Sequence, residues 1–414
     1  MLGQNQILFS DIVMNYTLAD LLVNQTFINT ANRDLQVEWG QLNYMPGSTV
    51  AVRRRNFVNI QRTPGPVNFQ PIQEQQEFVT FGDFYSGAFS YSMAELTLAI
   101  ADGKDIAKYG EIFYKRYIRP HLLQICAEMD YDIARQAAYD LVYFQGTPGV
   151  PINSFGPLAT AQALMNNVGV LNNEMYLAIN NQDSAQLMIS QQNAFNTMLN
   201  TEISEHGRLG RLGSMDILRT AGIYRQIAGD FGVGPITLTQ AFASGNTLQM
   251  TGLTPNAQVF NKGDAFSVAG AKITNPLLRS ADIAGMPDIQ FCVAQDTLSD
   301  GGGNATVVVN QNYISAPGDA YRNMSDALQI GAVVTPVGSH NVNVVYVRDS
   351  LTFMLAPLPR LNVPYSSTIT SDIDKNINMS FNLMGDVTQF VNSGRIDALP
   401  AFKWHPQYAV KLIS

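Results

Sequence analysis

The sequence predicts an α+β protein in which a small antiparallel β-barrel is inserted into a mixed domain. Three patterns predict this fold class. Residues 104–144 repeat apolar side chains at helical spacing, residues 235–338 form short strand-like runs between Gly, Asp and Asn turns, and mixed patterns return from residue 342. In NKGDAFSVAGAKITNP (261–276), a Gly-Asp turn leads into an alternating strand, and Asn-Pro ends it. Strands of this kind build small closed barrels.

The composition indicates a large protein with an unusually uncharged surface. A chain of 414 residues is too long for one ordinary domain and indicates two or three. Hydrophobic residues make up 46%, enough for a sizeable core, but charged residues make up only 14%, against roughly 25% in typical soluble domains. Such a surface favours a protein covered by neighbouring subunits, because removing an amide from water costs less than removing an ion. Plain compositional bias towards Asn and Gln is the alternative.

Charge and cysteine content exclude several classes. The net charge of −8 argues against a protein whose bulk surface binds nucleic acid phosphates. Cys126 and Cys292 lie far apart in the sequence, and we expect them to be buried, reduced thiols of a cytoplasmic protein. The N-terminus lacks a basic region before an apolar run, and no apolar run approaches about 18 residues, so we expect neither a signal peptide nor a membrane span.

The first part of the chain is predicted to form two arms. Residues 1–40 carry helical apolar spacing with Asp11 and Asp20 between the apolar positions, which indicates an amphipathic N-terminal arm. Residues 48–60 and 75–82 alternate as strands around a TPGP turn, which indicates a long hairpin arm. An isolated hairpin is marginally stable in water, so this arm is expected to lie against something else.

A long helix is predicted from Pro120 to about residue 144, since proline is well tolerated in a first helical turn. Its apolar positions form one stripe: Leu122, Ile125, Cys126, Met129, Ile133, Ala137 and Leu141. At 1.5 Å per residue the helix would be roughly 36 Å long. Beyond it, short helices and the strand-like MYLAI (175–179) indicate a mixed domain before the barrel.

Motifs that carry chemistry are missing from the sequence. There is no Gly-x-Ser-x-Gly elbow, no Walker A loop and no Cys-x-x-Cys pair. The four histidines, His121, His206, His340 and His405, are scattered without the i,i+4 spacing of a metal pair. We therefore expect no enzyme activity and no catalytic, metal or cofactor site.

The basic run Arg53-Arg54-Arg55 in the hairpin arm allows three interpretations. Strand alternation puts Arg54 on one face and the other two on the opposite face. The run is a solvated strand face, a set of ion pairs with a neighbouring subunit, or, least favoured, a nucleic acid contact. Guanidinium groups suit interfaces because they pair bidentately with carboxylates. Glu74 and Glu77 on the returning strand are nearby complements.

Four segments carry a resemblance to a known family: TAGIYRQIAGDFGVGPITLT (220–239), NKGDAFSVAGAKI (261–273), DAYRNMSDALQIGA (319–332) and NLMGDVTQFVNSGRIDAL (382–399). Together with the order of elements, they resemble the major capsid proteins of tailed bacteriophages with the HK97-like fold. The barrel insertion is most similar to that of coat proteins of the phage P22 type. In that fold, Gly263, Asp264 and Gly270 would be structural residues of barrel turns.

The resemblance implies a division of the chain into arms, peripheral and axial domains. The expected parts are an N-terminal arm (1–40), an extended hairpin arm (41–85), a peripheral domain with the spine helix (86–156), a first axial part (157–230), the inserted barrel (231–338), a second axial part (339–370) and C-terminal strands (371–414). Asp11 and Asp20 would contact a basic partner from the N-terminal arm.

The resemblance also implies a function. The chain would assemble into hexamers and pentamers of an icosahedral shell that encloses double-stranded DNA without binding it specifically, and would have no membrane contact. Expected partners are a scaffolding protein, a portal and a decoration protein, with assembly in the host cytoplasm and a final location in the virion. Two alternatives stay open: an encapsulin-like shell around cargo enzymes and, less favoured, a hydrolase with an accessory barrel.

Some shells of this family are cross-linked by an isopeptide bond between a lysine of the hairpin arm and an asparagine of a neighbour. Residues 46–85 contain no lysine, and a guanidinium that stays protonated is a poor nucleophile. We therefore predict shells without covalent cross-links. Boiled, reduced particles should run on a denaturing gel as one band near 45.4 kDa, and a ladder of oligomers would refute the prediction.

Overall fold

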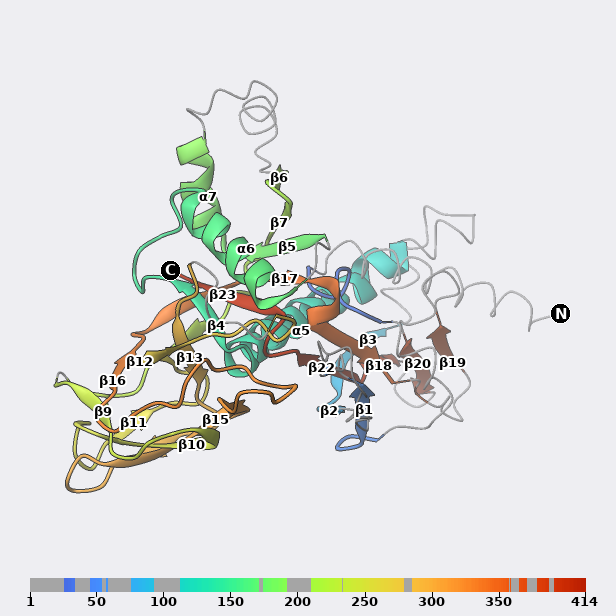
Figure 1. Ribbon diagram of the computed structural model, residues 1–414. Coiled ribbons are helices and arrows are strands. Elements are labelled where there is room, and N and C mark those ends of the chain that lie inside the picture. The colour runs from blue at the N-terminus through green and yellow to red at the C-terminus, as the bar shows by residue number, and fades with distance from the viewer. Residues whose placement is uncertain are drawn as a thin grey trace, which may run out of the picture. The chain divides into compact units, whose positions relative to one another are not determined.

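The structure is a computed structural model of the chain. It describes residues 26–33, 45–53, 57–58, 76–92, 112–170, 174–191, 210–232, 234–278, 285–356, 358, 365–370, 378–386 and 391–414. Figure 1 shows the chain as a ribbon with its elements labelled. Contacts among residues divide the chain into two compact units. The first unit takes in the described residues of 1–52, 77–133 and 352–403, and the second those of 53–76, 134–351 and 404–414.

The first unit contains a four-stranded antiparallel sheet in the order β19-β20-β21-β3. Its strands are β3 (Tyr85–Ser92), β19 (Tyr365–Thr370), β20 (Asn378–Asp386) and β21 (Val391–Ala398). An aromatic cluster packs around Phe89 of β3: its ring lies 6.2 Å from Phe113 and 6.4 Å from Phe381 of β20. Aromatic pairs at these distances stabilise a sheet beyond the area they bury.

Two further strand pairs belong mainly to the first unit. The hairpin strands β1 (Thr49–Arg53) and β2 (Gln76–Thr80) pair with each other, and β18 (Leu351–Leu355) pairs with β22 (Pro400–Trp404). The predicted strands 48–60 and 75–82 are thus confirmed over Thr49–Arg53 and Gln76–Thr80, whereas residues 57–58, inside the first predicted strand, are described and lie outside any strand.

The long helix is confirmed. A π-helical turn, η1 (Tyr114–Ile118), continues into α5 (Arg119–Asp140), and the division between the two units falls inside α5 after Ile133. Every member of the predicted stripe is buried. The predicted end near residue 144 was wrong, because Tyr143–Gly146 form strand β4, which pairs in parallel with the C-terminal strand. Aromatic residues at 143 and 144 favour a strand once a partner is present.

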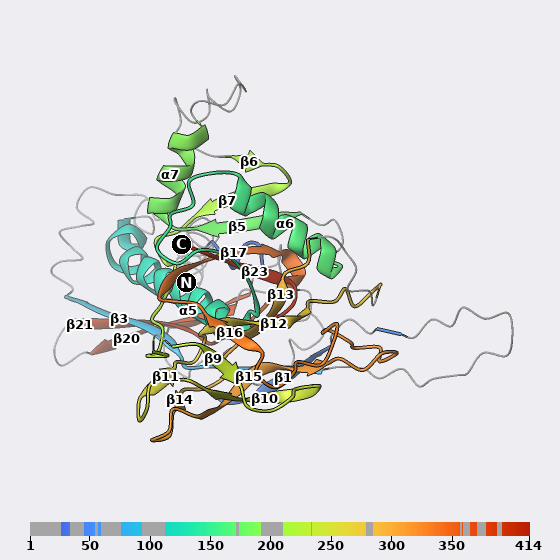
Figure 2. The same ribbon diagram turned by 60° about the vertical axis from the view of Figure 1, so that its left-hand side comes forward.

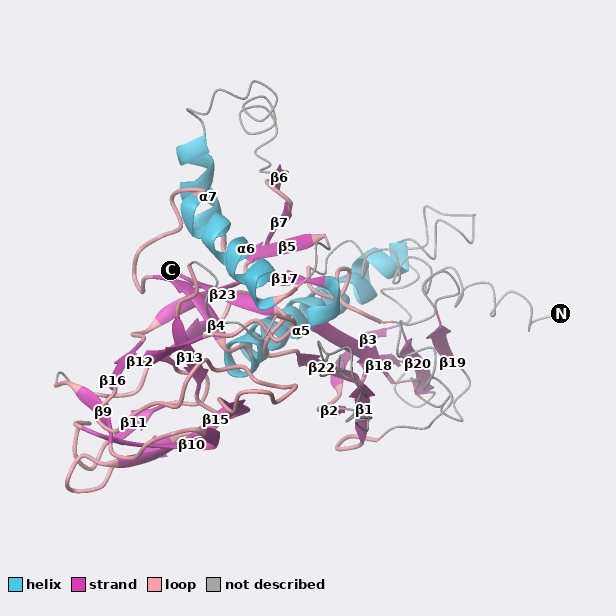
Figure 3. Cartoon of the chain, in the orientation of Figure 1, coloured by secondary structure: helices cyan, strands magenta, loops and turns pink. Residues whose placement is uncertain are grey.

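The second unit is built on a seven-stranded mixed sheet with the main order β4-β23-β17-β5-β7-β6, and β8 also pairs with β17. Its other strands are β5 (Met175–Ile179), β6 (Arg211–Leu212), β7 (Met215–Arg219), β8 (Arg225–Gln226), β17 (His340–Val347) and β23 (Ala409–Ile413). Helix α6 (Gly156–Val168) packs on this sheet, α7 (Asn181–Gln191) follows β5, and a 3₁₀ turn, η2 (Arg348–Ser350), follows β17 (Figure 3).

A small barrel is inserted between β8 and β17 (Figure 2). Its six main strands run in the order β13-β12-β16-β9-β10-β15: β9 (Ile236–Leu238), β10 (Ser244–Thr251), β12 (Ala265–Lys272), β13 (Asp288–Cys292), β15 (Ala305–Ile314) and β16 (Val333–Pro336). The short pair β11 (Gln258–Phe260) and β14 (Thr297–Leu298) accompanies them. A bridge between Val293 and Val309 joins the two edges, and the Ala294 amide donates to the Val308 carbonyl at 2.8 Å. The sheet is therefore nearly closed, and the predicted α+β class with an inserted barrel is confirmed.

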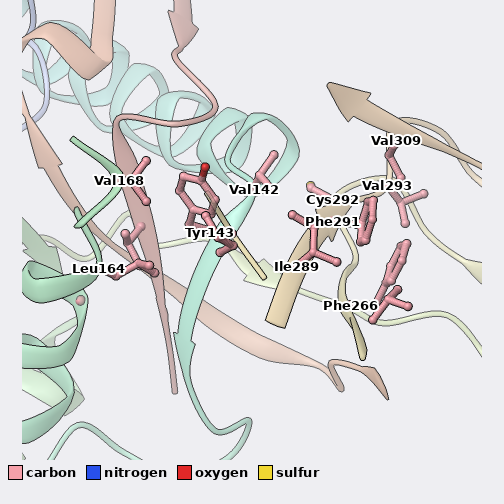
Figure 4. Packing of buried hydrophobic residues seen from close by; sticks show 14 of the residues in the cluster. Val142, Tyr143, Leu164, Val168, Phe266, Ile289, Phe291, Cys292, Val293 and Val309 are labelled. Atoms are coloured by element: carbon pink, nitrogen blue, oxygen red, sulfur yellow. The ribbon is translucent and has the colours of Figure 1, made fainter. Parts of the chain in front are cut away.

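One hydrophobic core runs through the second unit. Phe291 stacks on Phe266 with ring centroids 5.1 Å apart and lies 4.4 Å from Tyr313, all inside the barrel. The same cluster continues to Val142 and Tyr143 beside the end of α5 (Figure 4). The barrel therefore shares its core with the mixed sheet instead of enclosing a separate one.

The sequence prediction for the cysteines can be compared directly with the described residues, whereas that for most of the N-terminal arm cannot. Cys126 and Cys292 are both buried thiols outside any disulfide, as predicted. Residues 1–25 of the predicted N-terminal arm lie outside the described residues. No described helix is long and apolar enough to cross a bilayer.

Candidate functional site

The hairpin arm has one buried and one exposed face. Val50 of β1 and Val79 of β2 are buried in a small cluster with Phe81 and with residues of β18 and its neighbourhood. At the alternate positions, Phe78 is 62% exposed and Arg53 is exposed as well. Because successive strand residues point to opposite faces, the arm is anchored through one face and presents an aromatic ring and a guanidinium on the other.

The residues predicted for the two arms are only partly placed. Arg53 ends β1 and Glu77 lies on the paired strand β2. The others lie outside the described residues: Arg54, Arg55, Glu74, Asp11 and Asp20. Their contacts with a neighbouring subunit or a basic partner stay a prediction.

The Asn261–Asp264 turn, between β11 and β12, is closed by its own carboxylate. The Asp264 amide donates to the Asn261 carbonyl at 3.0 Å, and Asp264 Oδ2 accepts from the Asn261 amide at 2.8 Å. The same carboxylate accepts from the Gly229 amide at 2.9 Å and from Gln226 Nε2 at 2.7 Å. The turn is therefore fixed both to itself and to the segment that leads out of β8.

Lys411 of β23 joins this turn to the end of α5. Its side chain is completely buried, and Nζ donates to the Ala138 carbonyl at 3.1 Å and to the Gly263 carbonyl at 3.4 Å. Nζ also lies 3.6 Å from Cys292 Sγ. The last carbonyls of a helix lack helical partners and carry partial negative charge, so an ammonium group satisfies and stabilises them.

Barrel side chains complete the cap on α5. Cys292 Sγ of β13 donates to the Ala138 and Tyr139 carbonyls at 3.5 and 3.4 Å, and Asn310 Nδ2 of β15 also donates to the Tyr139 carbonyl. Three elements far apart in the sequence therefore meet at one helix end, which fixes how the barrel lies against the mixed sheet of the same unit.

Burial shifts the pKa of three groups around Lys411. Desolvation raises the pKa of Asp264, while its hydrogen bonds and the Lys411 charge oppose the shift. Desolvation likewise raises the pKa of the Cys292 thiol, against the influence of Lys411. Desolvation lowers the pKa of His340 to about 4, so this histidine is neutral at pH 7. The thiol is a structural donor in this setting and a poor nucleophile.

The sequence predictions missed Lys411, Gln226 and Cys292 as members of a common site. A signal for Lys411 was present, because one lysine interrupts the otherwise apolar strand AVKLI. A buried lysine needs partners, and the sequence does not reveal which carbonyls supply them. Gly263 and Asp264 lie in the turn described above, and Gly270 lies on β12 with φ 107°.

A second buried carboxylate holds residues 26 and 27, which lie within the predicted N-terminal arm. In the first unit, Asp130 of α5 accepts from the Thr26 amide at 2.9 Å and the Phe27 amide at 3.5 Å. Phe27 and Ile28 are completely buried beside it. Desolvation raises the pKa of Asp130 to about 6, although the hydrogen bonds from Thr26 and Phe27 oppose the shift.

Metal chemistry finds no support in the part of the chain that is described, where no group of three or more His, Cys, Asp and Glu side chains could hold an ion. His340 instead donates through Nδ1 to the Gly338 carbonyl at 2.7 Å, and the His405 ring stacks on Tyr408.

Comparisons with known proteins find similarity in structure only. No family model and no curated protein matches the chain. A solved structure of Mycobacterium phage Che8 is 10% identical, with 94% of this chain and 90% of that chain covered and a TM-score of 0.47. The capsid of Ralstonia phage GP4 is 8% identical, with 89% of this chain and 83% of that chain covered and a TM-score of 0.42. The mature capsid of bacteriophage PhiM1 is 12% identical, with 90% of this chain and 82% of that chain covered and a TM-score of 0.36. At these TM-scores the likeness is too loose to carry an argument.

Changing Gly263 to alanine tests the anchoring turn. Its φ is 92°, and an added Cβ would lie 2.6 Å from Tyr139 and 2.9 Å from Gln226 Oε1. Gly270 is the matched control, because its φ is 107° and nothing lies within 4 Å of an added Cβ. We expect G270A to lose about 1–2 kcal/mol of unfolding free energy from backbone strain alone, and G263A at least about 2 kcal/mol more from the clash. Urea unfolding of the unassembled subunit measures both; equal losses would contradict the role of the turn.

Asp130 should make stability depend on pH. Its folded pKa of about 6 exceeds the ordinary aspartate pKa of 3.8, so the stabilisation linked to its protonation is complete below pH 4 and is lost as the pH rises through 6. Asp130→Asn keeps an acceptor but cannot titrate. Relative to this variant, the wild-type subunit should gain up to about 3 kcal/mol between pH 7 and pH 4, measured by urea unfolding. A constant difference across that range would argue against a perturbed Asp130.

Proposed function

We propose that this chain is the major capsid protein of a tailed bacteriophage, which self-assembles into an icosahedral shell around double-stranded DNA. The observation that carries the proposal is the two-faced hairpin arm, anchored through Val50 and Val79 and exposed through Phe78. Such an arm is suited to a contact with another copy of the chain.

The exposed face of the arm has the chemistry of a protein interface. Phe78 is 62% exposed, Phe84 is 45% exposed and Met45 is 71% exposed, all within or beside the hairpin. Fully burying one such side chain contributes about 1.5–3 kcal/mol. Aromatic residues, Met and Arg are also the types enriched at interface centres. A contact in which each copy gives one arm and receives another is heterologous, and such contacts build closed rings when the rotation between copies closes.

The order of elements supports a capsid over other assemblies. A hairpin arm precedes a long helix, a mixed sheet follows, a barrel is inserted between β8 and β17, and strands of the first unit come after it. This is the order on which the resemblance to HK97-like capsid proteins rests, and the barrel insertion favours the phage P22 type over an encapsulin-like shell.

Composition supports the same proposal. Only 14% of the residues are charged, so covering the surface with neighbouring subunits has a low desolvation cost. The net charge of −8 suits the inner surface of a shell that encloses DNA without binding it tightly. Hexamers and pentamers, a scaffolding protein, a portal, a decoration protein and assembly in the host cytoplasm belong to this proposal. So does the absence of a catalytic role.

Electron microscopy of the purified protein tests the proposal. Closed shells of one protein, or DNA-filled shells from infected cells, are expected. Shells that enclose a cargo enzyme would favour the encapsulin-like alternative. Monodisperse monomers at concentrations where capsid proteins assemble would reject a shell function.

The arginine run should be needed for assembly and not for folding. Changing Arg53, Arg54 and Arg55 together to alanine should leave the thermal unfolding of the subunit unchanged and block shell formation, because the proposal places these charges at an interface, where they orient the contact between subunits. The matched control changes all three to lysine. It keeps the charge, loses the bidentate fork, and should assemble at an intermediate yield. Sedimentation measures the yield, and normal shells from the alanine variant would rule the role out.

A further inference from the structure

A cavity apart from the sites above lies where the inserted segment meets the turn before β23. Its volume is about 190 Å³. Pro276, Ile314 and Tyr321 come from the inserted segment, and His405 and Tyr408 come from the turn. We call this cavity the Phe57 socket, because Phe57 of the hairpin arm also lines it.

Phe57 enters the socket as a single aromatic ring. It meets the Tyr321 ring edge to face, with centroids 5.8 Å apart and an angle of 80° between the planes. The side chain is only partly buried, and the next residue, Val58, is 55% exposed. The arm therefore makes a local contact with its own subunit through one ring, and the adjoining valine remains open to solvent.

The walls of the socket are held by bonds that do not involve Phe57. Asn323 Oδ1 accepts from the Ile314 amide at 2.8 Å, and its Nδ2 donates to the Asn312 carbonyl at 2.9 Å. The His405 and Tyr408 rings stack with centroids 3.9 Å apart.

One further hydrogen bond ties the two walls together. Gln407 Nε2, from the turn, donates to Gln311 Oε1 of β15 at 3.2 Å. The socket is therefore preorganised for an aromatic ring, whichever copy of the chain supplies it.

We infer that the socket receives Phe57 from a neighbouring copy in the assembled shell, and that a free subunit fills it with its own Phe57. The inference rests on the proposed function and names a contact within it. The same ring and the same walls form both contacts, so exchange between identical copies needs no new surface.

The arm itself supplies the reason for exchange. Arg53 ends β1 on the exposed face, and Phe57 follows four residues later, within about 14 Å along an extended chain. When the exposed face of the arm binds a neighbour, Phe57 is carried to that neighbour as well. If Phe57 stayed in the socket of its own subunit, the arm could not extend fully towards the neighbouring copy.

Single-cysteine variants of the full chain distinguish the two contacts. Phe57→Cys and Tyr321→Cys subunits are mixed in equal amounts, assembled, treated with a short bismaleimide and run on a denaturing gel. The native thiols Cys126 and Cys292 are buried and should not react. Exchange predicts a band at twice the subunit mass from mixed shells. The matched control pairs Phe57→Cys with Leu298→Cys, which is 72% exposed but does not line the socket, and should give no such band.

The outcomes separate this inference from the proposed function. Wild-type protein that forms no shells overturns both. Shells without the dimer band overturn the exchange alone, especially if a Phe57→Cys/Tyr321→Cys double variant shows only an intramolecular cross-link by mass spectrometry. If the first pair does not assemble, Val58→Cys with Gln407→Cys repeats the test without removing an aromatic ring, and its result decides in the same way.

Discussion

The second unit depends on one buried ammonium group. Lys411 has no exposed surface, and burying an isolated charge is so unfavourable that its hydrogen-bond partners must be in place. Its acceptors are the Ala138 carbonyl at the end of α5 and the Gly263 carbonyl in the barrel turn, beside the Cys292 thiol. A shift of the barrel relative to α5 would separate these groups and leave the charge unpaired. The interaction therefore selects one packing of barrel, helix and sheet.

Several features of the chain follow from that requirement. The turn must bring the Gly263 carbonyl to Lys411, which needs a positive φ and leaves no room for a Cβ against Tyr139. Asp264 closes the turn and supplies negative charge near the ammonium. His340 stays neutral nearby, so the region holds no second buried cation from that side chain. Specificity of this kind comes from polar groups, while the continuous core around Phe266 and Phe291 supplies most of the stability.

The described surface of the hairpin differs from the interior of the second unit, because it exposes large apolar side chains. Inside the second unit, the hydrogen bonds of Lys411 and Asp264 decide the geometry, whereas the arm leaves Phe78 and Met45 exposed in a chain with few charges. Large exposed apolar side chains are a liability for a monomer and an advantage for a subunit that other copies cover. The chain has few charged residues, which makes its surface easier for other subunits to cover. Its buried charged residues, such as Asp130 and Lys411, each need hydrogen-bond partners of their own.

The sequence by itself determined the elements whose signal is local. Four-residue apolar steps located α5, MYLAI coincided with β5, and strand-like alternation located β1 and β2, because helical and strand periods are set by neighbours in the chain. The end of α5 was placed too late, since strand β4 forms only when β23 lies beside it. Lys411 shows what only the tertiary structure decided: its acceptors lie 273 and 148 residues away. A lysine in an apolar strand indicates that hydrogen-bond partners are needed. Which groups are its partners depends on the packing of the whole unit, because no helical or strand periodicity relates positions so far apart in the sequence.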